Sequence, residues 1–102
     1  MALPEKLHLE IVTPEKHLFS GDVDSVNVPA NTGYLGVLPG HAPLLAELGI
    51  GEIEYKVDGR VEYMFCSWGF IEVLPDRVIL LAQNAETSSD IDIKRAEEAK
   101  AR

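Results

Sequence analysis

The stretch EIEYKVDGRVEYMF, residues 52–65, decides the fold class of this chain. On both sides of Asp58-Gly59, apolar residues alternate with residues that are mostly charged. This is the period-two pattern of strands with one buried face. Asp58-Gly59 itself is a hairpin signal, because both central positions of a type I′ turn need a positive φ. The pattern predicts an antiparallel hairpin whose alternation places Tyr55 and Tyr63 with the core.

Outward from this hairpin, short strands separated by turn residues run from Leu7 to Ala82, which is typical of a sandwich or barrel. Leu7, Leu9 and Ile11 alternate with polar residues and predict a half-buried strand. The apolar run Val78 to Ala82 predicts a strand covered on both faces. Two packed sheets would supply that cover.

After Ala82 the pattern changes from strand to helix. Ser89 and Asp92 have the spacing of a capping box, so a helix is expected from near Asp90 to the end of the chain. Its apolar stripe is thin and mostly alanine, and a helix of about 13 residues is marginal alone in water. We therefore predict a mainly β fold with a β-sandwich domain over 1–84 and a C-terminal helical segment over 85–102, the first helix of a truncated hairpin.

Composition limits the classes of function. With 102 residues the chain has room for one domain, and its formal charge of −8 opposes binding to nucleic acid or to an anionic lipid surface. The single cysteine, Cys66, has Phe65 and Trp68 close by in sequence and no Lys, Arg or His beside it, so a buried, unreactive thiol is expected. No signal peptide and no apolar run of membrane-spanning length is present, so a soluble intracellular chain with protein partners is expected.

The residues that carry chemistry in other proteins form no reactive motif here. His8, His17 and His41 have no compact metal-ligand spacing, and the serines lie in no nucleophile elbow or phosphate-binding loop. Glycine and proline are dense between Pro29 and Pro43, which indicates loops that turn the corners of a sandwich. We expect neither an enzyme nor a metal site.

Five segments in order resemble a known family. They are Ile11-Val12-Thr13-Pro14-Glu15, Leu18-Phe19-Ser20-Gly21, Gly36-Val37-Leu38-Pro39-Gly40-His41-Ala42-Pro43-Leu44-Leu45, Gly69-Phe70-Ile71-Glu72-Val73, and Ile91-Asp92 with Arg95-Ala96. Together they are similar to the epsilon subunit of bacterial and chloroplast ATP synthases, and the segment PGHAPLL is the most specific of them. The family fold is a sandwich of about ten strands followed by a helix hairpin.

The resemblance implies a rotor subunit without catalytic activity. In the family, the sandwich binds the gamma subunit and the ring of membrane c subunits, and turns with them as ions cross the membrane. The implied place is the cytoplasmic face of the bacterial inner membrane, or alternatively the stromal side of the thylakoid, with membrane contact only through the complex. Whether protons or sodium ions drive rotation stays open.

The resemblance also assigns sites residue by residue. The gamma interface corresponds to Thr13, His41, Pro43, Leu44 and Leu45. The c-ring interface corresponds to Asn31, Thr32, Gly33 and Tyr34, where Tyr34 replaces an acidic residue common in relatives.

A nucleotide motif of some bacterial relatives is also matched. Its positions correspond to Glu86, Ile91, Asp92, Arg95 and Ala96. In those relatives a second helix completes the site. The same helix reaches the catalytic alpha and beta subunits and slows ATP hydrolysis. The sequence stops at Arg102, before such a helix, either because the chain is naturally short or because it is truncated. We therefore expect no cofactor and ATP as a weak regulatory ligand at most. We also expect little inhibition of ATP hydrolysis.

Two other classes of function stay open on the residues alone. The main alternative is a free-standing β-sandwich module that binds carbohydrate or peptide through exposed aromatic residues, for which Tyr34, Trp68 and, if it faces outward, Tyr55 are candidates. A weaker alternative is a small metal-dependent enzyme of the cupin kind, built on the three histidines.

Overall fold

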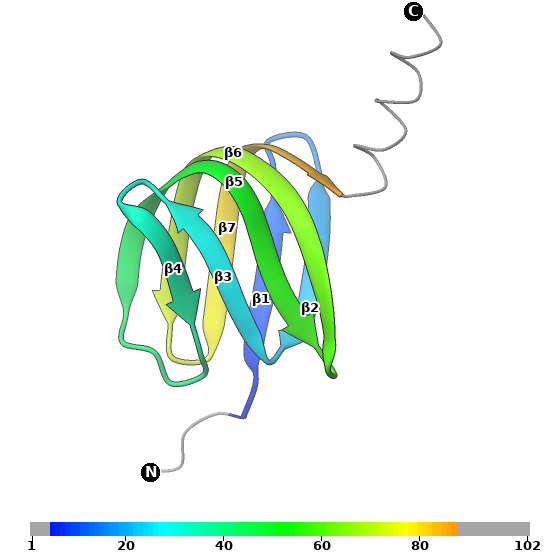
Figure 1. The fold of residues 1–102 in the computed structure, drawn as a ribbon, viewed down its shortest axis with the longest axis vertical. Helices are drawn as coiled ribbons and strands as arrows, with labels where there is room; N and C mark the ends of the chain where they lie inside the picture. The colour runs from blue at the N-terminus through cyan, green and yellow to red at the C-terminus, as the bar shows by residue number, and fades with distance from the viewer. Residues whose placement is uncertain (1–4, 88–102) are drawn as a thin grey trace, which may run out of the picture.

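The computed structural model describes residues 5–87, which form strands joined by short turns and loops (Figure 1). The predicted C-terminal helix lies outside the described residues. The last strand continues to Thr87, past residue 84, where the β-sandwich domain was predicted to end. The strands are β1 (Leu7–Val12), β2 (His17–Val23), β3 (Ser25–Ala30), β4 (Gly33–Val37), β5 (Leu44–Val57), β6 (Arg60–Leu74) and β7 (Arg77–Thr87).

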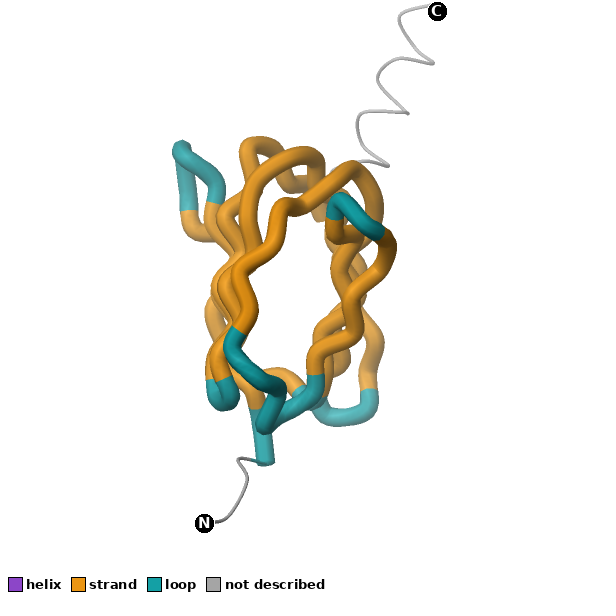
Figure 2. Tube along the Cα trace, turned by 90° about the vertical axis from the view of Figure 1, so that its left-hand side faces the viewer, coloured by secondary structure: helices purple, strands orange, loops and turns teal. Residues whose placement is uncertain are grey.

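All seven strands belong to one sheet, in the order β2-β1-β7-β6-β5-β3-β4. Neighbours are antiparallel except for β1 and β7, which are parallel. The sheet folds over itself into two layers (Figure 2). The mainly β sandwich expected from the sequence is therefore confirmed, although one continuous sheet forms both layers where two were expected.

Three long strands, β5, β6 and β7, run through both layers. Their segments 44–48, 69–74 and 77–82 pair with one another and with β1 in the back layer of Figure 1. Their segments 50–57, 60–67 and 84–87 pair with one another and with β3 in the front layer. Counted by layer, the seven strands contribute ten segments, in agreement with the expected number of about ten.

The strand pair β5–β6 exchanges its inner and outer faces where it passes from one layer to the other. Leu48 and Ile53 are both buried, although they lie an odd number of residues apart and should point to opposite faces of a flat strand. Cys66 and Ile71 on β6 show the same exchange. The strands keep their register throughout, so the exchange is a half-turn of the backbone at the corner between the layers.

On β6 this half-turn uses two consecutive residues with positive φ, Trp68 at 55° and Gly69 at 140°. A Cβ at Gly69 would lie 1.9 Å from the carbonyl oxygen of Leu81, far inside van der Waals contact. Glycine is therefore required at residue 69 on both conformational and steric grounds.

The hairpin is confirmed, but the predicted inward direction of Tyr63 is wrong. The two-residue turn pairs Val57 with Arg60, so the inward-facing odd residues of β5 lie opposite even residues of β6. Met64 therefore enters the core, and Tyr63 is 44% exposed.

The expectation that 78–82 is covered on both faces is also wrong. Val78 and Leu80 are buried, but Leu81 is 54% exposed. Its side chain points away from the front layer, on the outer face of the back layer.

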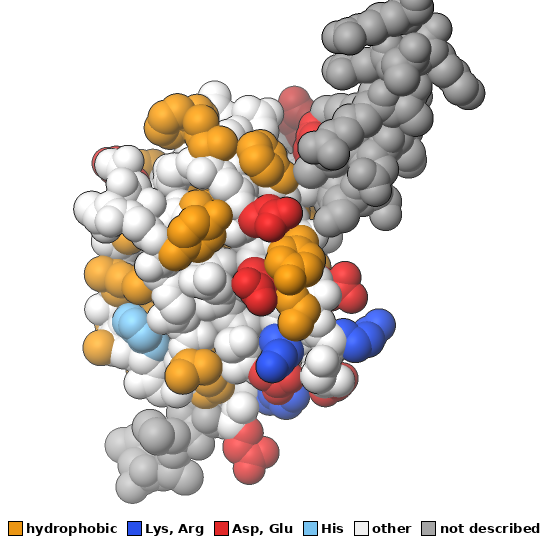
Figure 3. Space-filling model, in the orientation of Figure 1, with side chains coloured by type: hydrophobic (Ala, Val, Ile, Leu, Met, Phe, Trp, Pro, Cys, Tyr) orange, Lys and Arg blue, Asp and Glu red, His pale blue; other side chains and the backbone are white. Residues whose placement is uncertain are grey.

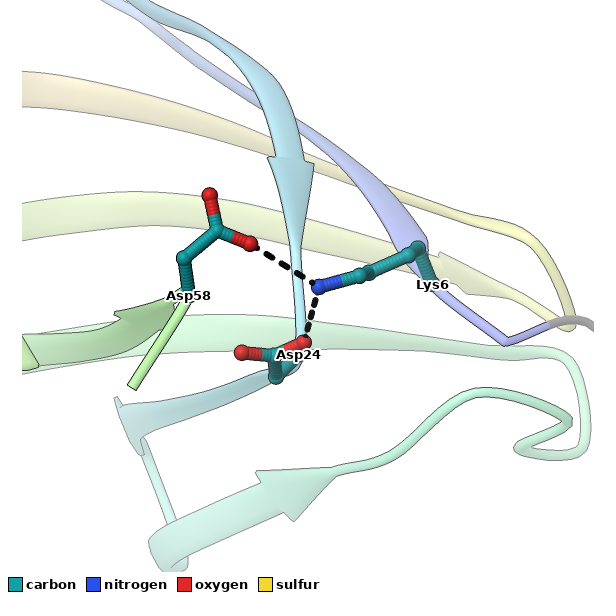
Figure 4. A network of polar contacts seen from close by, with 3 residues as sticks. All are labelled: Lys6, Asp24 and Asp58. Carbon is teal, nitrogen blue, oxygen red and sulfur yellow. Dashed lines mark hydrogen bonds and ion pairs between the residues drawn. The ribbon is translucent and has the colours of Figure 1, made fainter. Parts of the chain in front are cut away.

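Lys6, Asp24 and Asp58 form an ion-pair cluster (Figure 4). It lies at the end of the sandwich that carries the β5–β6 turn, opposite the corner. The Lys6 ammonium group, which precedes β1, pairs with the carboxylate of Asp24 and lies 3.4 Å from that of Asp58 in the hairpin turn. The hydrogen bond that Lys6 donates to the Asp24 carboxylate lowers the pKa of Asp24 and raises the pKa of Lys6. The cluster links the segment before β1 to the β2–β3 connection and to the β5–β6 turn.

We expect Gly69→Ala to lower the free energy of unfolding by more than about 2 kcal/mol, because backbone atoms cannot move away cheaply from the new methyl group. Urea denaturation followed by circular dichroism measures the change. The matched control is Gly36→Ala, where a Cβ would meet nothing closer than 4.0 Å; equal effects of the two variants would contradict the steric argument.

Asp24 should also contribute a pH-dependent part of the stability. Because its pKa is lower in the folded chain than the ordinary value of about 3.9, the contribution is present above that value and is lost as the pH falls through the folded pKa. We expect Asp24→Asn to flatten the loss of thermal stability below about pH 4. Asp76→Asn, in the β6–β7 turn, is the control, and the same flattening in both variants would disprove a specific role of Lys6.

Candidate functional site

The histidines do not form a metal site. His8 lies on β1 with its ring nitrogens 3.3 Å from an Asp22 oxygen and 3.4 Å from a Glu10 oxygen, whereas His17 begins β2 and His41 lies in the loop before β5. Among residues 5–87 no group of three histidine, cysteine or acidic side chains is arranged to hold a metal ion. Within the same residues, no helix has the length and apolar character needed to cross a bilayer.

Cys66 is fully buried on β6, as predicted. Burial raises the pKa of its thiol to about 11. The thiol therefore stays protonated at neutral pH and is a poor nucleophile.

Two of the predicted gamma-interface residues are held by local hydrogen bonds in loops. The Thr13 hydroxyl accepts a hydrogen bond from the Lys16 backbone N–H at 3.3 Å, which closes the β1–β2 turn. The His41 ring nitrogen Nδ1 lies 2.6 Å from the Ala42 carbonyl oxygen. The Gly40 N–H donates to the Pro75 carbonyl at 2.7 Å, so the His41 loop is attached to the β6–β7 turn.

These two residues lie at opposite ends of the back layer. His8, at the start of β1, pairs with Arg77 beside the turn that holds the His41 loop. Thr13 follows the other end of β1, near the corner (Figure 1). The structure therefore places Thr13 and His41 on one layer without bringing them to one point.

The outer face between them carries exposed apolar side chains. Leu45, Phe70 and Leu81 are 69%, 51% and 54% exposed, and Phe70 pairs directly with Leu81. Thr13 and Pro14 join those two residues in lining a shallow groove. We call Thr13, Leu45, Phe70 and Leu81 the back-layer surface.

Phe70 and Leu81 were not among the predicted site residues. The signal for Phe70 was present, since Ile71 and Val73 are inward-facing and Phe70 has the opposite parity on the same strand. Leu81 lies inside a continuous apolar run, where alternation carries no information about direction.

The predicted c-ring residues form the tight β3–β4 turn at the corner end of the sandwich. Asn31 and Thr32 are its two central residues, because Ala30 pairs with Gly33. The Asn31 backbone N–H donates to the Glu47 carbonyl at 2.9 Å, and its side-chain amide to the Glu47 carboxylate at 3.4 Å. Tyr34 is 62% exposed. The turn is thus anchored to β5 and presents an aromatic side chain.

The front layer shows hydrophobic and acidic side chains side by side on its outer face (Figure 3). Glu86, the first residue of the predicted nucleotide motif, belongs to β7 and lies opposite Phe65 on β6. The other members of that motif, Ile91, Asp92, Arg95 and Ala96, lie outside the described residues.

Comparison with protein families matches residues 6–88 to the model described as ATP synthase, delta/epsilon chain, beta-sandwich domain. Among curated proteins, the chain is 48% identical over 100 residues to the ATP synthase epsilon chain of Koribacter versatilis, covering 98% of this chain and 70% of that one. It is 52% identical over 97 residues to the epsilon chain of Solibacter usitatus, covering 95% and 72%.

Solved structures share the fold. A chain in the Euglena gracilis mitochondrial ATP synthase superposes with a TM-score of 0.80 at 24% identity, covering 99% of this chain and 68% of that one. A chain in the central stalk and c-ring structure of the Tetrahymena thermophila mitochondrial ATP synthase gives a TM-score of 0.70 at 14% identity, covering 84% and 69%.

We expect Cys66 to react with a disulfide reagent at pH 8 about 100-fold more slowly than an exposed thiol, because raising the thiol pKa to about 11 cuts the thiolate fraction by that factor and burial slows it further. The comparison is a Cys66→Ala chain carrying Val61→Cys in the exposed hairpin, measured by absorbance of the released thiol. Equal rates in the folded proteins would contradict the assignment of Cys66 as a core residue.

Proposed function

The chain belongs to the ATP synthase delta/epsilon family as an epsilon-type, non-catalytic subunit, and we propose that it carries rotation between the c-ring and the gamma subunit in the central stalk. The observation that carries this proposal is the identity of 48% to an epsilon chain over 98% of its length. As a stalk subunit it is peripheral to a membrane, and we place it on the cytoplasmic face of the bacterial inner membrane, with the thylakoid as the alternative.

The gamma subunit is the proposed partner of the back-layer surface together with His41, Pro43 and Leu44. Exposed apolar side chains on an ordered sheet face are typical of protein-binding surfaces. Leu45 and Phe70 project from neighbouring strands onto the same face, so a helix of a partner could cover both.

The c-ring is the proposed partner of the Asn31–Tyr34 turn. Its backbone and side-chain hydrogen bonds to Glu47 hold it against β5. A turn held in this way loses little conformational freedom on binding, which favours affinity.

The fold suits a part that transmits torque. Because β5, β6 and β7 run through both layers, a force applied at the corner end passes to the back layer along covalent chains and hydrogen-bonded strands. Independent sheets would rely on side-chain packing alone to carry it.

ATP is a weak regulatory ligand at most in this proposal. The motif matched by residues 86–96 supports nucleotide recognition. Titration calorimetry that gives a micromolar dissociation constant for ATP would overturn this part of the proposal.

We expect the chain to form a one-to-one complex with purified gamma subunit, and a His41→Ala, Leu45→Ala double variant to weaken it about 10- to 100-fold, as the loss of central apolar contacts usually does. Native mass spectrometry gives the stoichiometry and a dilution series gives the affinity.

The matched control is Val61→Ala, which removes an exposed apolar side chain at the hairpin end of the front layer. If Val61→Ala weakened the complex and the double variant did not, the gamma interface would be assigned to the front layer. No complex at micromolar concentration would refute the stalk function.

A further inference from the structure

Trp68 has the most unusual backbone of any large side chain among residues 5–87. Its φ is 55°, a conformation that costs free energy for a bulky residue and that glycine adopts freely. Its side chain is nevertheless 54% exposed, so the strain is not offset by burial of the indole ring in the core. A strained, exposed aromatic residue at a fixed place in a fold points to a use outside the core.

The backbone of Trp68 lies on β6, one strand away from β3 and the start of the β3–β4 turn. The pairs Leu48–Gly69 and Ile50–Ser67 place Gly49 opposite Trp68, and a Cβ at Gly49 would lie 3.7 Å from the carbonyl oxygens of Pro29 and Ala30. Trp68 and the turn are therefore separated across the sheet by one residue that has no side chain.

Two further apolar side chains extend this area. Ile50 and Tyr34 are 57% and 62% exposed, and the Tyr34 hydroxyl oxygen lies over β5, where it accepts a hydrogen bond from the Glu52 N–H at 3.4 Å. Hydrophobic side chains gather at the top of Figure 3, over the bends of β5 and β6. We call Tyr34, Ile50 and Trp68 the corner surface.

Carboxylates border the corner surface. Glu47 lies against the Asn31 amide and Glu52 follows Gly51 on β5. Carboxylates oppose approach to an anionic lipid surface and would lose their hydration in hydrocarbon. The charges favour a protein partner that offers cationic side chains with apolar stems.

We propose that the corner surface is the apolar anchor of the c-ring contact, with Trp68 at its centre and Glu47 and Glu52 pairing with cationic side chains of the ring loops. This inference rests on the proposed function, because the adjoining Asn31–Tyr34 turn is the proposed ring contact. It adds Ile50 and Trp68 as affinity-determining residues, and it explains why an aromatic residue occupies a position that glycine would occupy without strain.

The test measures binding of the gamma complex of this chain to purified c-ring in detergent. Trp68→Gly should keep or raise the thermal midpoint, because it removes backbone strain, and should weaken ring binding at least 10-fold. Val61→Ser, an exposed apolar change at the opposite end, should alter neither quantity. As Trp68 is the single tryptophan, its emission should shift to the blue in the wild-type complex with the ring.

The other outcomes separate this inference from the function on which it rests. If Trp68→Gly binds like the wild type while Asn31→Ala, Tyr34→Ala binds weakly, the ring contact stands and the role of Trp68 is refuted. If the wild type does not bind the ring, both fall. Trp68-dependent binding to phosphatidylcholine vesicles would assign the corner surface to lipid and overturn the ring assignment.

Discussion

The half-turn of β5 and β6 at the corner is the constraint on which the rest of the molecule depends. There the single sheet passes from one layer to the other, and the residues buried in each layer come from opposite faces of the same strands. The missing side chain at Gly69 lets β6 lie close to the Leu81 carbonyl of β7 at this point. A side chain there would push the two strands apart and open the core where the layers join.

The same constraint explains where the exposed apolar residues lie. A strand that exchanges its faces must expose residues near the exchange, and Ile50 and Trp68 lie there. Phe70 is exposed because the back layer has a single covered face. Such side chains cost solubility in an isolated chain and are tolerated where partners cover them. In the function proposed above, the gamma subunit would cover the back-layer surface and the c-ring would cover the corner surface.

Much of the fold and part of the site follow from local sequence. The Asp58-Gly59 hairpin, the half-buried β1 strand and the buried Cys66 were predicted from alternation and turn chemistry, and all three are confirmed. Tyr63 was assigned to the wrong face, although the two-residue turn contains the information needed to orient it. Leu81 was assigned to a covered strand, because an apolar run does not say how many faces are covered.

By itself, the sequence determined the strand pattern, the turns, the acidic character of the chain and its resemblance to the epsilon family, because these depend on neighbours along the chain. The tertiary structure alone decided that Thr13 and His41 lie at opposite ends of one layer and that Trp68 lies one strand away from the strand that leads into the Asn31 turn. Those relations depend on the pairing of strands distant in sequence and on the half-turn at the corner, which reverses the facing of every residue beyond it. Local periodicity cannot contain that reversal.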